Sequence, residues 1–168
     1  MTKSKLFLFA GLAALLILPV LAGRALAGQA TTSFAVSANV QSSCSVSAGA
    51  LAFGSYLATS GTPNDATSNI LVTCTSGLAY TVALDGGTNT ATVNARAMTD
   101  GLTHNLSYAL YTASNHSTLW GDGTLTTSTV GGTGNGAAQT LPVYGRIPVS
   151  QFVSAGSYTD SVGVTVNY

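Results

Sequence analysis

The side chains that could carry acid–base chemistry are few and scattered along this chain. Its two histidines, His104 and His116, each lie among polar residues, and the acidic residues are five aspartates. Most of these aspartates stand beside glycine or another turn former, where a carboxylate commonly caps its own backbone. A glycosidase would need two carboxylates paired across a substrate. We therefore expect no catalytic residue, and the aspartates in question are Asp65, Asp85, Asp100, Asp122 and Asp160.

A glycine-rich run at 132–136 (Gly-Thr-Gly-Asn-Gly) is the candidate for binding a phosphorylated cofactor. It contains no lysine and no strand-to-helix pattern surrounds it, whereas a phosphate-binding loop needs both. We interpret it as a flexible loop and expect no small-molecule cofactor.

Two cysteines, Cys44 and Cys74, are the remaining residues with distinctive chemistry. A zinc site would need further ligands at short spacing, and the two distant histidines do not supply them, so no metal site is expected. An even pair of cysteines in an exported domain indicates a disulfide. Closing a loop of this length would contribute roughly 3–4 kcal/mol to stability.

Export is predicted by the first 27 residues. Two lysines precede an apolar run, Leu6–Ala22, which is broken by Pro19 and followed by the small residues Ala25-Leu26-Ala27. This layout is typical of a secretory signal peptide cleaved after Ala27. A retained membrane anchor is the weaker alternative, because about 20 apolar residues are needed to cross a bilayer.

Removal of this leader leaves a mature chain with a net charge of −3. Arg96 and Arg146 are its basic side chains, and all five aspartates remain. Nucleic-acid binding requires a basic surface to displace counterions from phosphates, so that class of partner is excluded. The mature length fits a single domain with a real core.

Alternating apolar and polar residues, punctuated by turn formers, predict strands along the whole mature chain. No stretch carries a convincing helical pattern. Many short strands in a domain of this size indicate an antiparallel β-sandwich of immunoglobulin-like type. The expected strands are 31–40, 43–47, 50–53, 69–75, 79–85, 95–99, 106–112, 118–120, 139–149 and 158–168.

Two of these segments alternate with unusual regularity. Phe34, Val36, Ala38 and Val40 would share one face of an extended N-terminal segment, and Val162, Val164, Val166 and Tyr168 one face of the last strand. If the last strand leaves the sandwich incomplete, its free edge could accept a strand from another chain. The alternative interpretation is that both segments are ordinary strands of one closed sandwich.

Across its mature length the sequence resembles the spore coat protein U domain family, which includes the major subunits of archaic, Csu-type chaperone/usher pili. The residues that carry the resemblance agree in order and spacing. They are Ser43-Cys44-Ser45-Val46, Leu51-Ala52-Phe53-Gly54, Ile70-Leu71-Val72-Thr73-Cys74, Tyr80-Thr81-Val82-Ala83-Leu84-Asp85-Gly86-Gly87, Leu106-Ser107-Tyr108-Ala109-Leu110-Tyr111, Leu119-Trp120-Gly121-Asp122-Gly123, Val143-Tyr144-Gly145-Arg146-Ile147 and residues 158–168.

The resemblance implies an incomplete immunoglobulin-like pilin that reaches the cell surface through the periplasm. A periplasmic chaperone would hold it, an outer-membrane usher would assemble it with other copies or related pilins, and the fibre would support adhesion or biofilm formation. The implied organisation is a signal peptide (1–27), a donor-strand segment (28–40) and a pilin-like domain (41–168). Phe34, Val36, Ala38 and Val40 would then be the donor side chains. Val162, Val164, Val166 and Tyr168 would border the groove and meet the chaperone.

One alternative function is a secreted carbohydrate-binding or coat protein of the same β-sandwich fold. In a carbohydrate-binding module, Trp120 with Tyr108 or Tyr111 could form the stacking platform for a sugar ring.

Overall fold

The computed structural model describes residues 27–168, so the predicted signal peptide lies outside the described residues except for Ala27. Within the described residues, the compact domain comprises residues 39–168. Residues 27–43 carry no secondary structure and have exposed side chains. None of the helices within 27–168 is long and apolar enough to cross a membrane.

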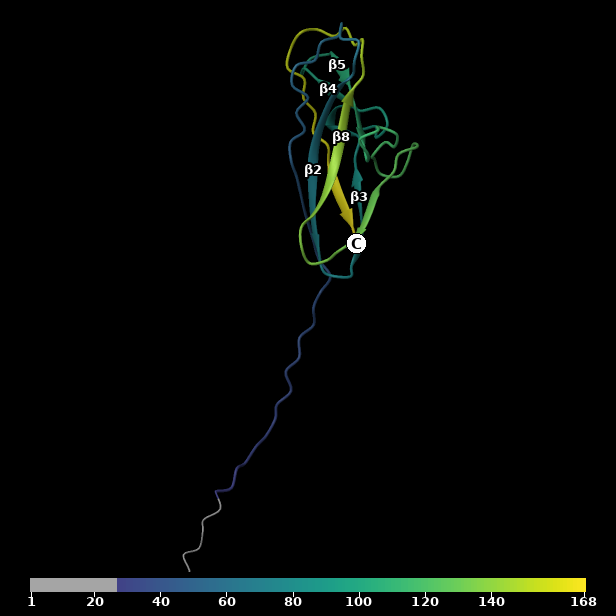
Figure 1. Cartoon of the computed structure of the whole chain (residues 1–168). Coiled ribbons are helices and arrows are strands. Elements are labelled where there is room, and N and C mark those ends of the chain that lie inside the picture. The colour runs from purple at the N-terminus through teal and green to yellow at the C-terminus, as the bar shows by residue number, and fades with distance from the viewer. Residues whose placement is uncertain (1–26) are drawn as a thin grey trace, which may run out of the picture. The chain divides into compact units, whose positions relative to one another are not determined.

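The domain is built almost entirely from antiparallel strands, which confirms the predicted all-β class (Figure 1). The single helix among the described residues is one turn long, so the expectation of an essentially helix-free fold holds. The elements in chain order are β1 (Cys44–Ala48), β2 (Asn64–Cys74), β3 (Ala79–Leu84), α1 (Gly87–Thr90), β4 (Ala97–Thr99), β5 (Asn105–Ser107), β6 (Ala109–Tyr111), β7 (Val130–Thr133), β8 (Gln139–Ile147) and β9 (Val164–Asn167).

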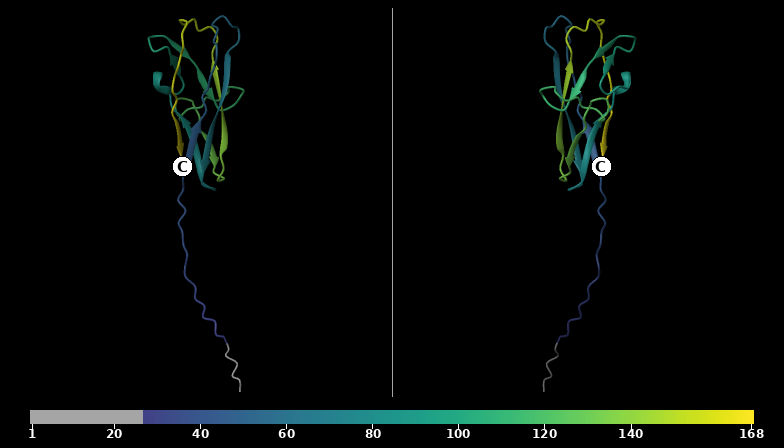
Figure 2. Two further views of the ribbon diagram at one scale, coloured as in Figure 1. Left: turned by 90° about the vertical axis from the view of Figure 1, so that its left-hand side faces the viewer. Right: turned by 90° about the vertical axis from the view of Figure 1, so that its right-hand side faces the viewer.

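These strands form a sheet of order β1-β2-β8-β6, a sheet of order β7-β3-β9 and the hairpin β4-β5. The hairpin lies at one end of the domain and the C-terminus at the other (Figures 1 and 2). Alternate residues of the central strands β2 and β3 point into the core, as a half-buried strand requires. The most deeply buried apolar side chains are Ile70, Val72, Cys74, Tyr80, Val82, Leu84, Leu106, Trp120 and Ile147.

Cys44 and Cys74 form a disulfide, as predicted. They are register partners at the start of β1 and the end of β2. The bond therefore fastens the first residue of the sandwich to a central strand, directly after the segment without secondary structure.

Several expected strand boundaries are wrong. Residues 31–40, 50–53 and 118–120 form no strand, β2 begins at Asn64 and not at 69, and β7 extends into the expected glycine loop. For the two strands that form, backbone partners decide the outcome: β8 extends far enough to pair with the start of β2, and β3 pairs along one edge with β7. Glycine at position 132 also leaves room for the ring of Tyr80.

Candidate functional site

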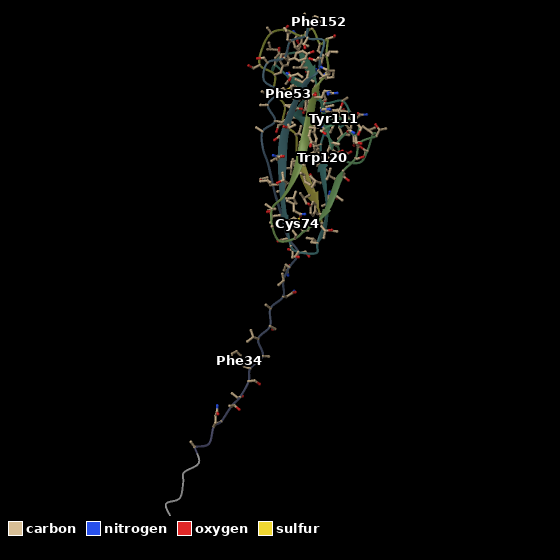
Figure 3. All side chains as sticks on the ribbon, in the orientation of Figure 1. Phe34, Phe53, Cys74, Tyr111, Trp120 and Phe152 are labelled. Carbon is tan, nitrogen blue, oxygen red and sulfur yellow. A yellow bond between two sulfur atoms is a disulfide. The ribbon has the colours of Figure 1, made fainter. Side chains whose placement is uncertain are left out.

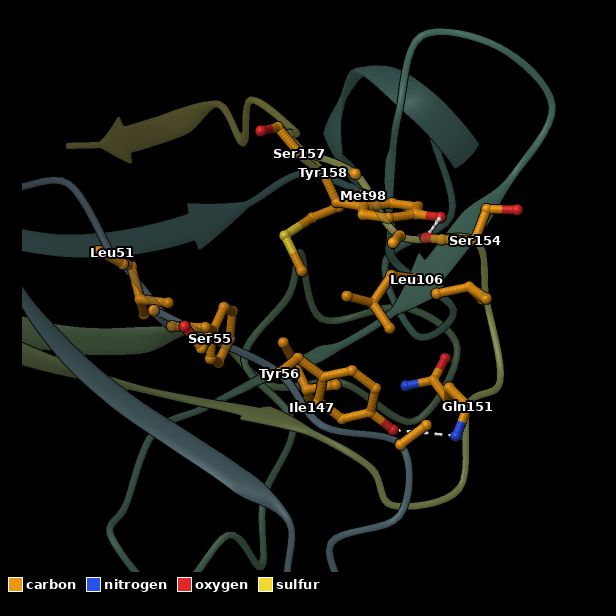
Figure 4. A pocket seen from close by; sticks show the side chains of 17 residues that line it. Leu51, Ser55, Tyr56, Met98, Leu106, Ile147, Gln151, Ser154, Ser157 and Tyr158 are labelled. Carbon is orange, nitrogen blue, oxygen red and sulfur yellow. Dashed lines mark hydrogen bonds between the residues drawn. The ribbon is translucent and has the colours of Figure 1, made fainter.

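A long groove with a mainly apolar floor runs along one side of the sandwich, between the chain after β1 and the chain before β9. It consists of two adjoining cavities, with volumes of about 660 and 370 Å³, that share Leu51, Met98 and Tyr158 in their linings. The larger cavity lies by the β4-β5 hairpin, which contributes Met98 and Leu106 (Figure 4). We call residues 48–56 the first rim and residues 151–164 the second rim.

The first rim leaves the sheet soon after β1. The Gly49 amide still donates to the carbonyl of Asn69 at 2.9 Å, but the ladder to β2 stops there. Beyond it, the side-chain amide of Asn64 donates to the carbonyls of Phe53 and Ser55, at 3.1 Å each. A side chain has therefore replaced a neighbouring strand as the partner of this backbone.

Glycine 145 on β8 explains why the first rim can fold over the sheet. A β-carbon at this position would come within 2.8 Å of the Phe53 ring and 2.9 Å of the Leu51 side chain. Its absence lets both side chains pack against β8 and form part of the groove lining. A larger residue here would push the rim outward.

The second rim is attached to the opposite sheet. The Asp85 amide donates to the carbonyl of Gly163 at 3.1 Å, and the Thr88 amide donates to that of Ser161 at 3.0 Å. Further along, Thr99 and Thr159 exchange two backbone hydrogen bonds of 2.9 Å. The rim is therefore bonded along its outer side.

Both rims present unpaired backbone groups to the groove. In an antiparallel ladder, successive residues turn their N–H and C=O groups to opposite edges. Gly163 is bonded outward to Asp85, so Val162 and Val164 turn theirs toward the groove. By the same rule the backbone N–H and C=O groups of Ala48 face the groove, because those of the next residue, Gly49, face β2. Such edges are ready to pair with another strand.

The floor of the groove is mainly apolar and uncharged. Its polar groups are the hydroxyl of Ser68, which donates to the carbonyl of Gly49 at 2.8 Å, and that of Tyr108, which donates to Asp160 Oδ2 at 2.7 Å. Burial, followed by this hydrogen bond, raises the pKa of Tyr108 far above its ordinary value, so the hydroxyl stays protonated at any physiological pH. The buried side chains that complete the floor are Ile70, Leu84, Leu106, Leu110, Val143 and Ile147.

Of the predicted groove-edge residues, Val162 and Val164 line the smaller cavity. Val166 is half-buried and packs against the core on β9, and Tyr168 is 61% exposed. The structure thus brings the first two to the groove and leaves the last two outside its lining.

The predicted donor side chains lie in the segment without secondary structure. Phe34, Val36 and Val40 are 86%, 84% and 82% exposed, and Ala38 is also exposed (Figure 3). Large apolar side chains exposed in succession are unusual for a protein surface and indicate a site of interaction.

Trp120 is fully buried and donates its indole N–H to the carbonyl of Val82 at 3.1 Å. Tyr108 is 7% exposed. The expected sugar-stacking platform is therefore wrong for both residues, because their rings fill the core. Tyr111 is half-buried beside the ring of His116.

The histidines and aspartates make separate local contacts. His104 Nδ1 lies 2.6 Å from Asp100 Oδ2, and this hydrogen bond lowers the pKa of Asp100. His116 lies 3.8 Å from Asp65, whose carboxylate is bonded in bidentate fashion to Arg146. Within 27–168 no three such residues converge in a way that could hold a metal ion.

Sequence reasoning missed most of the groove lining. Leu51 and Phe53 belong to a segment that was expected to be a strand, and their motif gave the only sequence signal for this rim. Met98 and Tyr158 were expected only as strand residues, and Val153 carried no signal. They reach the groove because β4 and the loop after β8 fold toward each other, which no local pattern encodes.

Comparisons with known proteins bear on this site. A family model described as Spore Coat Protein U domain matches residues 30–165. No curated protein matches the chain. Among solved structures, the chain is similar to a chain in the crystal structure of the CsuC-CsuE chaperone-tip adhesion subunit pre-assembly complex, from archaic chaperone-usher Csu pili of Acinetobacter baumannii.

That structural match has a TM-score of 0.53 and 24% identity, which shows a common fold. It covers 77% of the present chain. The present chain spans 40% of the length of the matched one.

Proposed function

The chain belongs to the Spore Coat Protein U domain family, and we propose that it is a structural subunit of a surface fibre, an archaic chaperone/usher pilus, assembled by strand donation between copies. The observation that carries this proposal is the groove, which has a mainly apolar floor and unpaired backbone along both rims. An incoming strand would satisfy those backbone groups and cover the groove floor.

The N-terminal arm, residues 28–40, is the segment we propose as the incoming strand from a neighbouring copy. Its alternation places Phe34, Val36, Ala38 and Val40 on one face, suited to an apolar floor, and polar residues on the other. The first rim spans nine residues, roughly 30 Å when extended. The seven residues from Phe34 to Val40 extend over roughly 23 Å and so fit within it.

The direction of the incoming strand follows from the need to propagate a fibre. Residues 41–43 are all that separate Val40 from the first strand of the donor's own domain. Each copy sends out its arm at the Cys44 end, so the neighbour whose arm it accepts must sit at the opposite end. The incoming strand would then run antiparallel to 158–167, with Val40 at the larger cavity and Phe34 at the smaller.

Export and assembly partners complete the proposal. A subunit with an open groove needs protection until its neighbour arrives, because unpaired edges and apolar surface promote aggregation. The structure similar to this fold contains a chaperone bound to a pilus subunit. For the present chain we propose a periplasmic chaperone and an outer-membrane usher as partners, signal-peptide export, and a final location at the cell surface, where the fibre supports adhesion or biofilm formation.

A self-complemented chain tests strand donation directly. A copy of residues 29–41 is appended to the C-terminus through a flexible linker, and the mature chain without it serves as the control. We expect the appended chain to be a stable monomer by sedimentation and the control to aggregate or polymerise. A control chain that is monomeric and equally stable to urea would contradict the proposal, because its groove would need no strand.

A further inference from the structure

The second rim is held by two carboxylates where a β-strand would otherwise provide the partner. Asp160 Oδ1 accepts hydrogen bonds from the amides of Thr88 (2.9 Å), Asn89 (3.3 Å) and Ser161 (2.8 Å), and from the Thr88 hydroxyl (3.1 Å). Its other oxygen accepts from Tyr108. One carboxylate thus joins the rim to α1 and to the groove floor.

Asp85 does the same from the opposite side. It directly follows β3. Its Oδ1 accepts hydrogen bonds from the amide of Gly163 on the rim at 2.8 Å and from the amide of Gly87 at 2.9 Å. Its own amide donates to the carbonyl of Gly163. The carboxylate has taken the place of the backbone oxygen that would bond to Gly163 in a regular ladder.

The arrangement is reciprocal, and two glycines make it possible. A β-carbon at Gly87 would overlap the carboxylate of Asp160, and one at Gly163 would overlap that of Asp85. Asp160 therefore occupies the space that Gly87 leaves shortly after Asp85. Asp85 in turn occupies the space that Gly163 leaves shortly after Asp160.

A buried arginine stabilises the base of this arrangement. Arg96 is 2% exposed, and it donates from Nε to the carbonyl of Asp85 at 2.8 Å and from Nη2 to that of Leu84 at 3.3 Å. Because the backbone carbonyl of Asp85 is bonded to Arg96, it is the carboxylate of Asp85 that accepts the hydrogen bond from the rim at Gly163. The carbonyl of Arg96 in turn accepts from the Tyr108 amide at 3.0 Å, which links the floor to the same unit.

We propose that Asp85 and Asp160 are positioning residues for strand acceptance: they hold residues 160–163 with their outer backbone satisfied and their inner edge open to the incoming strand. The inference rests on the proposed function and assigns a role to Asp160, which lines the smaller cavity, and to Asp85, which lies outside the groove lining. It has a physical basis in preorganisation, because a rim already in place loses less conformational freedom when a strand binds.

The proposal is tested by strand exchange in the self-complemented chain. The probe is a fluorescein-labelled peptide of residues 29–41, and its uptake in place of the appended strand is followed by anisotropy. We expect Asp160→Ala to accelerate exchange by about tenfold or more, since several charge-assisted hydrogen bonds are lost. Asp160→Asn keeps a neutral acceptor and should give a smaller acceleration.

The matched control is Asp122→Ala. This carboxylate bonds only to the amide and hydroxyl of Thr124 in an exposed turn, so its loss should leave the exchange rate unchanged. Hydrogen–deuterium exchange separates positioning from general stability: increased amide exchange should be confined to 160–166 and to the bonded amides of Thr88 and Asn89 in the Asp160 variants. Equal increases in β2 and β8 would show a merely structural role and overturn the proposal.

A double-mutant cycle checks the reciprocal fit. Gly163→Ala should accelerate strand exchange in the parent chain, where the new methyl meets Asp85, and should have little further effect in an Asp85→Ala background. Gly61→Ala, at an open position, is the control. Additive effects would contradict the assignment.

The outcomes distinguish this inference from the proposed function. If Asp160→Ala does not fold, Tyr108→Phe provides the test, because it keeps the ring and removes one bond to Asp160; exchange should then rise by about threefold. Unchanged exchange in the variants, with a parent that does exchange its strand, overturns the positioning role alone. A parent that neither needs nor exchanges the appended strand overturns the proposed function.

Discussion

The arm from Phe34 to Val40 and the C-terminal segment from Val162 to Tyr168 have the same alternation and reach different structures. In the C-terminal segment, β9 pairs with β3, and Val164 and Val166 are half-buried. In the arm no strand forms, and Phe34 is 86% exposed. Alternation therefore shows that a segment suits a sheet, whereas the available partner decides whether it joins one.

The difference also separates two kinds of apolar surface. The valines of β9 contribute to the stability of their own domain, because the sandwich buries them. The arm contributes nothing comparable in the described chain, so its exposed apolar residues are free for the interaction that we propose with another copy. Polar substitutions in the arm should therefore impair assembly and leave the stability of the domain unchanged. Those in β9 should lower the stability of the domain itself.

The largest expected effect is the loss of assembly on substitution in the arm. Phe34→Asp should reduce fibre yield more than about tenfold, because a carboxylate would have to be buried against the apolar floor. In the self-complemented chain, whose appended copy stays unchanged, it should alter the free energy of unfolding by less than about 0.5 kcal/mol. Electron microscopy and urea unfolding provide the two measurements.

Ser37→Asp is the matched control in the arm, because Ser37 lies on the polar face of the same segment and should preserve fibre yield. Val164→Asp supplies the contrast on β9 and should destabilise the self-complemented chain by about 2 kcal/mol or more. Wild-type fibre yield from Phe34→Asp would remove the distinction between the segments.

Removing the disulfide should have the next largest effect. Cys44 marks the point where the arm ends and the paired domain begins. Replacing both Cys44 and Cys74 with serine in the self-complemented chain should lower the free energy of unfolding by roughly 3–4 kcal/mol, because the unfolded chain gains freedom. Urea unfolding of the variant, and of the parent with and without reductant, measures this; a reductant-insensitive parent would contradict it.

The smallest effect is expected on the fully paired sheet, at Asp65. Arg146 lies across from it, bonded to both carboxylate oxygens at 2.7 Å, and this hydrogen bond lowers the pKa of Asp65 below its ordinary 3.8. The pair's contribution is thus fully present above pH 3.8 and is lost as the pH falls through the lower folded-state pKa.

Because the pair is solvent-accessible, Asp65→Asn should cost no more than about 1 kcal/mol at pH 7. The deficit of the variant relative to the parent should shrink as the pH approaches 3, measured by urea unfolding across that range. Asp122→Asn, which faces no arginine partner in the described structure, is the control. A deficit that grows on acidification would show that the pair is not its source.

Much of the fold could be predicted because its signals are local. Alternating residues predicted the antiparallel sandwich, the even pair of cysteines predicted the bond between Cys44 and Cys74, and the family resemblance is confirmed by the match over residues 30–165. The burial of Trp120 could not be predicted from the sequence, because a lone tryptophan suits either a sugar-stacking platform or a hydrophobic core.

The groove could be predicted only in outline. Val162 and Val164 were expected at its edge and line it, but Met98 and Tyr158 come from distant parts of the chain. The two carboxylates were interpreted as turn caps. Asp85 does cap the Gly87 amide, yet it also accepts from the amide of Gly163, which is 78 residues away in the sequence.

The sequence by itself determined which segments can be strands, where the covalent cross-link forms and which faces are apolar, because these properties depend on neighbouring residues and on side-chain type. Tertiary structure alone decided which edges lack a partner. Backbone pairing depends on what folding brings alongside each strand, and so only the folded domain separates the half-buried valines of β9 from the exposed arm that carries the same pattern.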